Sequence, residues 1–341
     1  MSIRISIIVP TYNASKYIER CMYSVLDQCK EFANQIEIII VNDGSTDNTE
    51  SLVKEIISCN PTQNISLISI ENGGLANARN IGLNRANGEY FINLDADDFL
   101  QNGIIEKLLN AIKIHQPYCC FFGFQDYDEN RHSIVEKYDA RFNYVKDIIS
   151  GEQAFCYKAA KYIWICQGSA CYRRTILEKN NIYNIKGVNQ GEDFLFIMSF
   201  LACSSKVISI PIIGVNISFR ADSMMHESFN ESHLQVFDAI SILYMRISEL
   251  NAQIDKEELL EWIDVEFELE RMAVAKKIIM SYCDDKNIMK KKLILIPPYK
   301  HYNINKLSFP KRIESWIFNH NLTIYYALTR VFKYFKGMRS R

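Results

Sequence analysis

Residues 71–100 read ENGGLANARNIGLNRANGEYFINLDADDFL, and this stretch ends with three carboxylates crowded directly after an apolar run. Like charges as close as those of Asp95, Asp97 and Asp98 repel one another and raise one another's pKa. The arrangement is unfavourable unless a cation or a hydrogen-bond network compensates it. The cluster therefore requires either a ligand or a structural reason.

The regions before this cluster alternate between β-rich runs and helical patterns. The β-rich runs are nearly continuous in Ile and Val, as strands covered on both faces should be, and they predict strands at residues 3–9, 36–42, 65–70 and 90–94. Apolar residues at helical spacing predict helices between them, at residues 17–29, 49–57 and 75–85. The alternation predicts an α/β fold in which helices wrap a parallel sheet.

The chain beyond residue 100 is less regular. We predict a helix at 104–115 and a strand at 118–127, then an irregular charged stretch to about residue 150. The next predicted elements are a strand at 163–172, a short helix at 174–180, an apolar helix within 187–202 and two β segments within 207–220 that break at Pro211. From residue 226 the pattern is helical, with amphipathic stretches at 234–250 and 256–280.

Composition limits the classes of function. The 39 basic and 40 acidic residues give a net charge of −1, which argues against nucleic acid as a partner. The ten cysteines lie mostly in apolar segments and form no Cys-x-x-Cys pair, as expected for reduced thiols in a cytoplasmic protein. The sequence has no secretory-signal pattern and no apolar run of about 20 residues, so we expect no membrane span.

Polar loops follow the predicted strands, and they read PTYNAS, NDGSTDNT, ENGG and DADD. Open α/β sheets bind ligands at the carboxyl ends of their strands, so these loops form the predicted site. Spacing alone leaves two interpretations of the DADD carboxylates open. They either cap the helix that follows, or they hold a hard divalent cation such as Mg²⁺ or Mn²⁺. An EF-hand at residues 43–50 is excluded, because that loop is too short and lacks glycine at its sixth position.

These loops and their flanking elements together resemble family 2 glycosyltransferases of the GT-A fold. The resemblance rests on IIVPTYNASKYIERCMYSVLDQ, IIIVNDGSTDNT, ENGGLANARNIGLNRANGEYFINLDADD and the later GEDFLF, which occur in the family's order. It implies a Rossmann-like nucleotide-sugar-binding domain with a mixed central sheet at residues 1–225. Residues 1–100 would be its nucleotide-binding half and 101–225 its acceptor-binding half, and a helical C-terminal region would follow at 226–341.

The resemblance also implies how the donor is bound. Thr11 and Tyr12 match positions that line the nucleobase and ribose pocket, and Asp43 matches the acidic residue that accepts a hydrogen bond from a pyrimidine ring. Arg79 matches an arginine that contacts the base, with a surface salt bridge as its alternative role. The complete donor-binding set implied in this way is Pro10, Thr11, Tyr12, Asp43, Arg79, Asp95, Ala96 and Arg220.

The chemistry implied by the resemblance depends on two acidic groups. In the family's Asp-x-Asp motif, Asp97 would be the principal ligand of a divalent metal, Mn²⁺ or Mg²⁺, with Asp95 near the ribose and the metal and Asp98 as a cap. The metal would offset the charge of the departing diphosphate. The acidic pair in GEDFLF would supply the base, with Asp193 as first choice and Glu192 as second, while a helix cap is the alternative role for Asp193. A single displacement with inversion needs no enzyme nucleophile.

The end of the chain matches the family less closely. In FRADSMMHES, Arg220 fits a diphosphate contact, and His226 is either a third metal ligand or an ordinary surface histidine. The tail at residues 306–341 is basic, and its apolar residues between 313 and 335 have near-helical spacing. Such a helix suits an anionic membrane surface, or else it packs on the core or on a partner subunit. The QxxRW motif of processive synthases is absent, so we expect transfer of a single sugar.

We therefore expect an inverting glycosyltransferase that moves one hexosyl or N-acetylhexosaminyl group from a nucleotide-diphosphate sugar, preferably UDP-linked, to a hydroxyl of a lipid-linked glycan in surface polysaccharide biosynthesis. Its expected location is cytoplasmic, at the inner face of the membrane. An inactive GT-A scaffold would predict loss of Asp97 or Asp193, and both are present. A sugar nucleotidylyltransferase would predict a glycine- and arginine-rich triphosphate loop, which PTYNAS is not.

Overall fold

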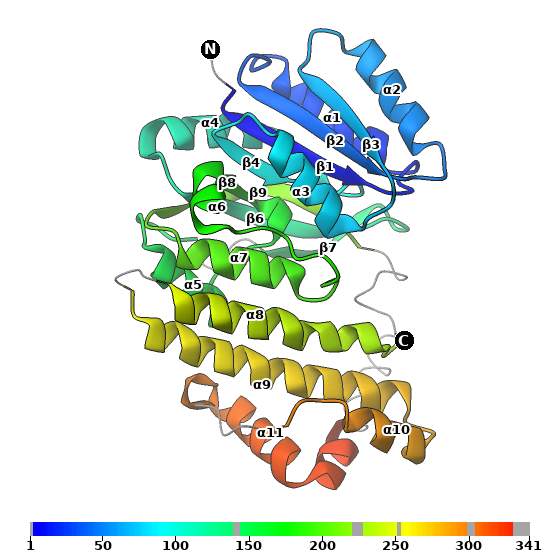
Figure 1. Cartoon of the computed structure of the whole chain (residues 1–341), viewed down its shortest axis with the longest axis vertical. Helices are drawn as coiled ribbons and strands as arrows, with labels where there is room; N and C mark the ends of the chain where they lie inside the picture. Colours follow the sequence, from blue (N-terminus) through cyan, green and yellow to red (C-terminus); the bar gives the residue numbers. More distant parts are fainter. Residues whose placement is uncertain (1–2, 139–143, 220–227, 251–253, 299–303, 330–341) are drawn as a thin grey trace. The chain divides into compact units, whose positions relative to one another are not determined.

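The computed structural model describes residues 3–138, 144–219, 228–250, 254–298 and 304–329 (Figure 1). Its contacts divide the chain into two compact units, a first unit of residues 1–220 and a second unit of residues 221–341. Within the described residues, no helix is long and apolar enough to cross a membrane.

The first unit is built on one nine-stranded sheet. Its strands lie in the order β3-β2-β1-β4-β8-β6-β9-β5, and β7 pairs with β6 outside this path. The strands are β1 (Ile5–Thr11), β2 (Ile36–Asp43), β3 (Ile65–Ile70), β4 (Tyr90–Asn93), β5 (Phe99–Leu100), β6 (Cys119–Asp128), β7 (Ser133–Tyr138), β8 (Ala170–Arg173) and β9 (Val207–Phe219).

The sheet is parallel where the sequence predicted it and mixed beyond that point. Strands β3, β2, β1 and β4 pair in parallel. Strand β8 then pairs antiparallel with both β4 and β6, and β9 is parallel to β6. The predicted α/β class with a mixed central sheet is confirmed.

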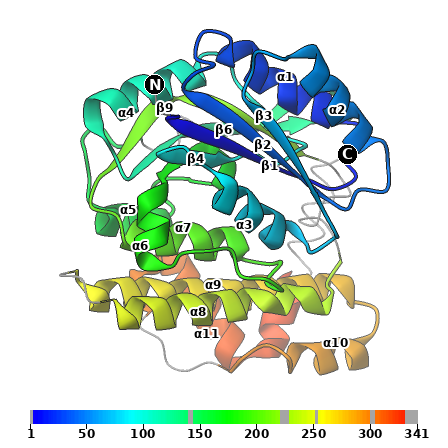
Figure 2. The same ribbon diagram turned by 45° about the horizontal axis from the view of Figure 1, so that its top comes forward.

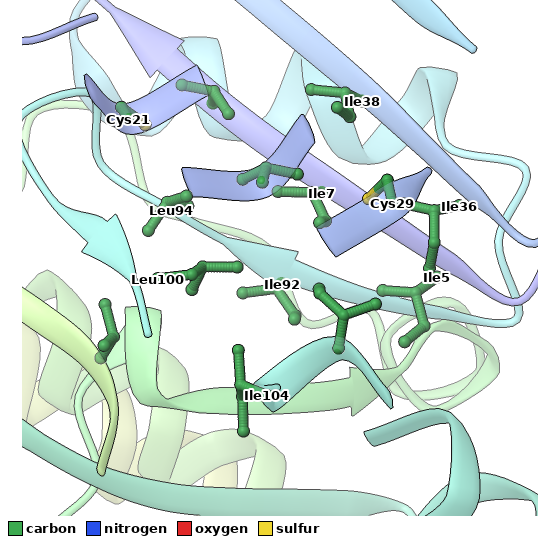
Figure 3. Packing of buried hydrophobic residues seen from close by; sticks show 14 of the residues in the cluster. Ile5, Ile7, Cys21, Cys29, Ile36, Ile38, Ile92, Leu94, Leu100 and Ile104 are labelled. Carbon is green, nitrogen blue, oxygen red and sulfur yellow. The ribbon is translucent and has the colours of Figure 1, made fainter. Parts of the chain in front are cut away.

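Helices cover both faces of this sheet. They are α1 (Ile18–Cys29), α2 (Thr49–Cys59), α3 (Leu75–Arg85), α4 (Ile104–His115), α5 (Gly151–Ala159), α6 (Arg174–Asn180) and α7 (Glu192–Ala202). Figure 2 shows α1, α2 and α4 on one face and α3 and α7 on the other. Helices α1, α2 and α4 pack against alternate residues of the parallel strands. Figure 3 shows three of these residues, Ile5, Ile7 and Ile92. Successive side chains of a strand point to opposite faces, and helices cover both faces here, so the strands read as continuous apolar runs.

Several predicted elements differ from the observed ones. Strand β9 is continuous through Pro211. Its register against β6 shifts on both sides of Gly123, which forms a β-bulge. The proline lies in this bulge, where a strand tolerates the missing N–H. The strand predicted at 163–172 is limited to Ala170–Arg173, since a 3₁₀ turn at Gln167–Ser169 precedes it. Strand β7 lies in the stretch that was expected to be irregular, up to about residue 150. Helix α5 begins just after that stretch, where no helix was predicted.

The second unit is helical. It contains α8 (Gln235–Glu249), α9 (Lys256–Ser281), α10 (Lys286–Leu293) and α11 (Phe309–His320), with a further helical stretch at residues 322–329. Asp255 and Asp285 begin α9 and α10 by accepting hydrogen bonds from backbone N–H groups of the first turn. A buried ion pair between Glu268 and Arg271 on α9 also bonds to Asn319 of α11, which fixes α11 against α9.

Glu37 of β2 is a buried acceptor at which three parts of the first unit meet. Its side chain accepts hydrogen bonds from Ser6 Oγ at 2.6 Å and from the backbone N–H groups of Asn87 at 2.6 Å and Gly88 at 3.1 Å. These bonds join β2 to β1 and to the turn between α3 and β4. Glu37 therefore stabilises the part of the sheet that carries the acidic cluster.

We expect Glu37→Ala to lower the free energy of unfolding of the first unit by about 3 kcal/mol, because it leaves several buried donors without an acceptor. Urea denaturation followed by circular dichroism would measure this change. The exposed Glu31→Ala is the matched control and should shift the free energy by less than about 0.5 kcal/mol. Equal effects of the two substitutions would contradict the role given to Glu37.

Candidate functional site

The candidate site lies at one edge of the sheet, where the parallel strands end. Ile8 pairs with Asn93 and Thr11 pairs with Asn42, so the carboxyl ends of β1, β2 and β4 come together. Pro10 and Thr11 are buried in β1, and Thr11 Oγ1 donates a hydrogen bond to the Val41 carbonyl at 3.2 Å. The next side chain, Tyr12, is 53% exposed at this edge.

Asp43, the last residue of β2, organises the loop that enters α3. Its Oδ1 accepts the backbone N–H of Gly73 and its Oδ2 that of Gly74, each at 2.8 Å. Gly74 has φ 84°, a conformation that favours glycine. Each carboxylate oxygen has a second lone pair, so these two bonds leave Asp43 with further acceptor capacity.

Arg79 of α3 joins two acidic residues that are far apart in the sequence. Its guanidinium donates to Asp193 Oδ1 at 2.8 Å and to both carboxylate oxygens of Asp95 at 2.9 and 3.1 Å. The arginine side chain is 1% exposed, whereas those of Asp95 and Asp193 are 38% and 42% exposed. The sequence predicted that Arg79 contacts the nucleobase or forms a surface salt bridge. The structure shows a salt bridge that is buried rather than on the surface, in which the planar guanidinium binds two carboxylates at once.

The acidic pair at the start of α7 has altered proton affinities. Glu192 is only partly accessible, and its partial burial, together with the charge of Asp193, raises its pKa to about 7. Burial also raises the pKa of Asp193, and Arg79 opposes that change. Arg79 itself has a raised pKa, because the two carboxylates outweigh the effect of its own burial. The site thus contains a carboxyl group that exchanges its proton near neutral pH.

The three carboxylates of the DADD turn have different surroundings. Asp95 faces Arg79, and Asp97 is partly exposed. Asp98 is 6% exposed, and its Oδ1 accepts the backbone N–H of Ser218 on β9 at 2.8 Å. Burial, followed by the neighbouring carboxylates, raises the pKa of Asp98 well above its usual range. Asp98 therefore does not cap the helix that follows; Gly103 occupies the residue before α4. Ala96, between Asp95 and Asp97, is buried.

The polar face of α1 that holds this turn was not predicted from the sequence. Arg20 donates to the Asp97 carbonyl at 2.9 Å and to Glu129 at 2.5 and 3.0 Å, and its guanidinium lies 4.2 Å from the centre of the Phe99 ring. Ser24 Oγ accepts the backbone N–H of Leu100, and Gln28 Oε1 accepts that of Ile105. The signal was present in the sequence, because polar residues every four positions share one face of a helix.

A second feature that was not predicted is a chain of amide side chains, three buried and one half-buried. Asn93 Nδ2 donates to Gln167 at 2.9 Å, Gln167 Nε2 donates to Asn184 at 3.2 Å, and Asn184 bonds to Asn80 of α3. The chain ties the end of β4 to the helix that carries Arg79. No local pattern could have identified it, because its members come from distant parts of the sequence.

Two predicted site residues, Arg220 and His226, lie outside the described residues. Among the residues that the structure does describe, no group of three or more His, Cys, Asp or Glu side chains is arranged to hold a metal ion. The structure thus brings together the ends of β1, β2 and β4, the DADD turn and the acidic pair of α7. It gives these groups two fixed arginine contacts, one from α3 and one from α1.

Comparison with known proteins identifies relatives of this chain. The family model described as Glycosyl transferase family 2 matches residues 6–180. A protein of Haemophilus influenzae described as an uncharacterized glycosyltransferase is 32% identical over 205 residues, 60% of this chain and 72% of that protein. The minor teichoic acid biosynthesis protein GgaB of Bacillus subtilis is 39% identical over 111 residues, 33% of this chain and 12% of GgaB.

The similarity to solved structures extends further along the chain. A crystal structure of S. aureus TarS in complex with UDP-GlcNAc superposes with a TM-score of 0.63 at 18% identity, covering 85% of this chain and 89% of that chain. This similarity, together with the family match, confirms the predicted GT-A fold. Several curated relatives are much longer, and the chain spans only 12 to 18% of their length.

We expect Arg79→Met to lower the free energy of unfolding of the first unit by about 3 kcal/mol, because it leaves two neighbouring carboxylates without their shared cation. Chemical denaturation at pH 7 would measure the loss. Arg131→Met is the matched control, since that arginine is 82% exposed and its ion pair with Asp128 is long, at 3.8 Å. A loss confined to the control, or absent from both variants, would contradict the bridge.

We expect Glu192→Gln to stabilise the protein by about 2 kcal/mol at pH 8, with no gain at pH 4. The pKa of Glu192 is about 7 in the folded chain, against an ordinary value of 4.5. Between pH 4.5 and pH 7, the folded state therefore keeps a proton on this carboxyl group that the unfolded state has lost. Wild-type stability should therefore fall as pH rises through this window, and the glutamine variant should lack that part of the fall. Thermal unfolding at several pH values would test it; a parallel pH dependence of the two proteins would refute it.

Proposed function

Because the chain belongs to glycosyl transferase family 2, we propose that it transfers one sugar from a UDP-linked donor to a hydroxyl group of a glycan acceptor. The observation that supports this most strongly is the Arg79 bridge, which fixes the acidic turn after β4 beside the acidic pair of α7. A transferase needs these two groups together, since one faces the leaving group and the other faces the attacking hydroxyl. The Haemophilus relative supports the reaction class.

We assign the donor to residues 1–100 and the acceptor to residues 101–225, with 226–341 as a separate helical region. Tyr12 offers an exposed ring against which a nucleobase can stack. Asp43 has remaining acceptor capacity for the ring N–H of a pyrimidine. Arg79 is given a positioning role in place of the base contact, because its guanidinium is occupied by two carboxylates. The TarS complex contains UDP-GlcNAc, which favours uridine in the donor.

We propose that Asp193 is the base, and that the adjacent Glu192 takes part in the same proton transfer. Arg79 bonds to Oδ1 of Asp193 and thereby fixes the direction in which Oδ2 points. Glu192, with a pKa of about 7, matches the proton affinity that suits a general base near neutral pH. An acceptor hydroxyl that loses its proton to this pair attacks the anomeric carbon from the face opposite the diphosphate. A single displacement of this kind inverts the anomeric configuration.

A divalent metal, Mn²⁺ or Mg²⁺, fits the donor set of the DADD turn in part. Asp97 is partly exposed and would be its principal ligand, with Asp95 beside it, while Asp98 is turned toward Ser218. Carboxylate oxygens are the ligands that these cations prefer. When bound, the metal would offset negative charge on the diphosphate. The proposed third ligand, His226, and the proposed diphosphate contact, Arg220, lie outside the described residues.

The acceptor is proposed to be a lipid-linked glycan of surface polysaccharide biosynthesis, handled at the inner face of the membrane. Teichoic acid biosynthesis is the role given in the name of the Bacillus relative, and it supports a surface glycan. The basic tail at residues 306–341 supports a membrane location.

The experiment is a transfer and donor-hydrolysis assay of the purified chain with UDP-, dTDP-, GDP- and CMP-sugars, each with Mn²⁺ and with EDTA. We expect one UDP-sugar to be consumed only with metal. Asp193→Asn should lower kcat by about 10²- to 10⁴-fold, because it removes the proton acceptor while keeping the shape of the side chain.

Asp27→Asn is the matched control, because Asp27 is 60% exposed and pairs with Lys30 on the surface. It should leave kcat unchanged. Full activity of Asp193→Asn would refute the assigned base, and a larger loss in Glu192→Gln would move the role to that residue. Absence of donor binding under every condition would favour a scaffold in place of an enzyme.

A further inference from the structure

The second unit exposes an apolar surface on its last two helical segments. On α11 the exposed side chains are Phe309 at 67%, Ile313 at 45% and Trp316 at 60%, and their spacing places them along one side of the helix. The stretch at 322–329 adds Ile324 at 49% and Leu328 at 42%. We call this set the α11 apolar surface. An exposed group of large apolar side chains on adjacent elements indicates an interaction site.

The other side of the same segments is packed. Phe318 and Tyr325 are buried against α9, and the Tyr325 hydroxyl donates to the Met272 carbonyl at 3.2 Å. The amphipathic pattern of the tail therefore has one face that stabilises the second unit and another that remains uncovered within the described residues. Packing on the core accounts for the first face alone.

A cavity of about 530 Å³ opens beside this surface, between α9, α11 and the stretch at 322–329. Its walls are mainly apolar and include Met280, Ile313, Ile317 and Leu328. Glu314 lies at the cavity, but it forms ion pairs with both Lys276 and Lys311, so its charge is compensated. The cavity has the chemistry to receive a hydrocarbon chain.

Basic residues outnumber acidic ones in the sequence of this last part of the chain. Arg312 is exposed next to Ile313, and Glu314 is the only acidic residue from position 304 to the end of the sequence. The twelve residues that follow Thr329 contain Arg330, Lys333, Lys336, Arg339 and Arg341. Each basic group near an anionic lipid surface contributes about 1 kcal/mol of attraction. A segment that combines exposed apolar side chains with an excess of basic residues in its sequence complements an anionic bilayer.

We propose that the α11 apolar surface inserts into the headgroup region of an anionic phospholipid bilayer, with a lipid chain entering the adjoining cavity. A second copy of the chain fits less well, because a symmetric dimer through this face would bring the same basic residues together. The proposal refines the membrane location given above and rests on it. It does not depend on the identity of the donor, since lipid binding is measured without any sugar nucleotide.

The test is sedimentation of the full chain with vesicles of phosphatidylcholine alone and of phosphatidylcholine with phosphatidylglycerol. We expect binding to the anionic vesicles, weakened by salt, together with a blue shift of tryptophan fluorescence. Trp316→Glu should weaken vesicle binding by about tenfold and abolish most of the shift. Trp316 is exposed, so this substitution should not disturb folding, which circular dichroism would verify.

Met245→Glu is the matched control, because Met245 is 54% exposed on α8 and lies outside the α11 apolar surface. It should retain wild-type vesicle binding. Equal binding by wild type and Trp316→Glu, or no binding to anionic vesicles, would overturn the proposal. A dimer in light scattering that Trp316→Glu dissociates would assign the surface to a second copy. Donor hydrolysis in solution should be the same in all three proteins, which separates this result from a failure of the proposed enzyme activity.

Discussion

A buried guanidinium must be paired with carboxylates, and in this protein that requirement positions the site. Arg79 is 1% exposed and bonds to Asp95 and Asp193, which lie 98 residues apart in the sequence but 2.8 to 3.1 Å from the same side chain. Because an unpaired buried arginine would be strongly destabilising, α3 can dock only where both carboxylates are present. The acidic turn after β4 and the start of α7 are thereby brought together.

The rest of the site is arranged around this bridge by polar contacts with backbone atoms. Arg20 and Ser24 hold the DADD turn and the strand after it, while Asp43 holds the loop that enters α3. Backbone bonds of this kind fix the path of a loop without using the side chains that would meet a ligand. The partly exposed side chains at the site, Tyr12, Asp97 and Asp193, are thus carried on rigid supports.

Local pattern was sufficient for most elements of the first unit. The predicted strand at 65–70 and the helices at 75–85, 104–115 and 174–180 have the observed bounds, because apolar periodicity and burial coincide there. Periodicity failed at Pro211, where a missing N–H suggested a break in the strand. A bulge in the register of β9 accommodates the proline instead. Helix α5 was missed because its buried face consists largely of Gly and Ala, although Ser150 and Gln153 form a capping box at its start.

The sequence by itself determined the α/β class, the strand ends at which the polar loops meet, and the residue types available there. These follow from local chemistry, since side-chain period and turn residues act over a few positions. Only the tertiary structure decided that Arg79 bridges two carboxylates, that Asp98 faces Ser218, and that one face of α11 is exposed while the other packs on α9. These outcomes depend on which distant side chains are buried together. Desolvation and charge pairing act between such side chains through space, so they cannot be inferred from neighbours along the chain.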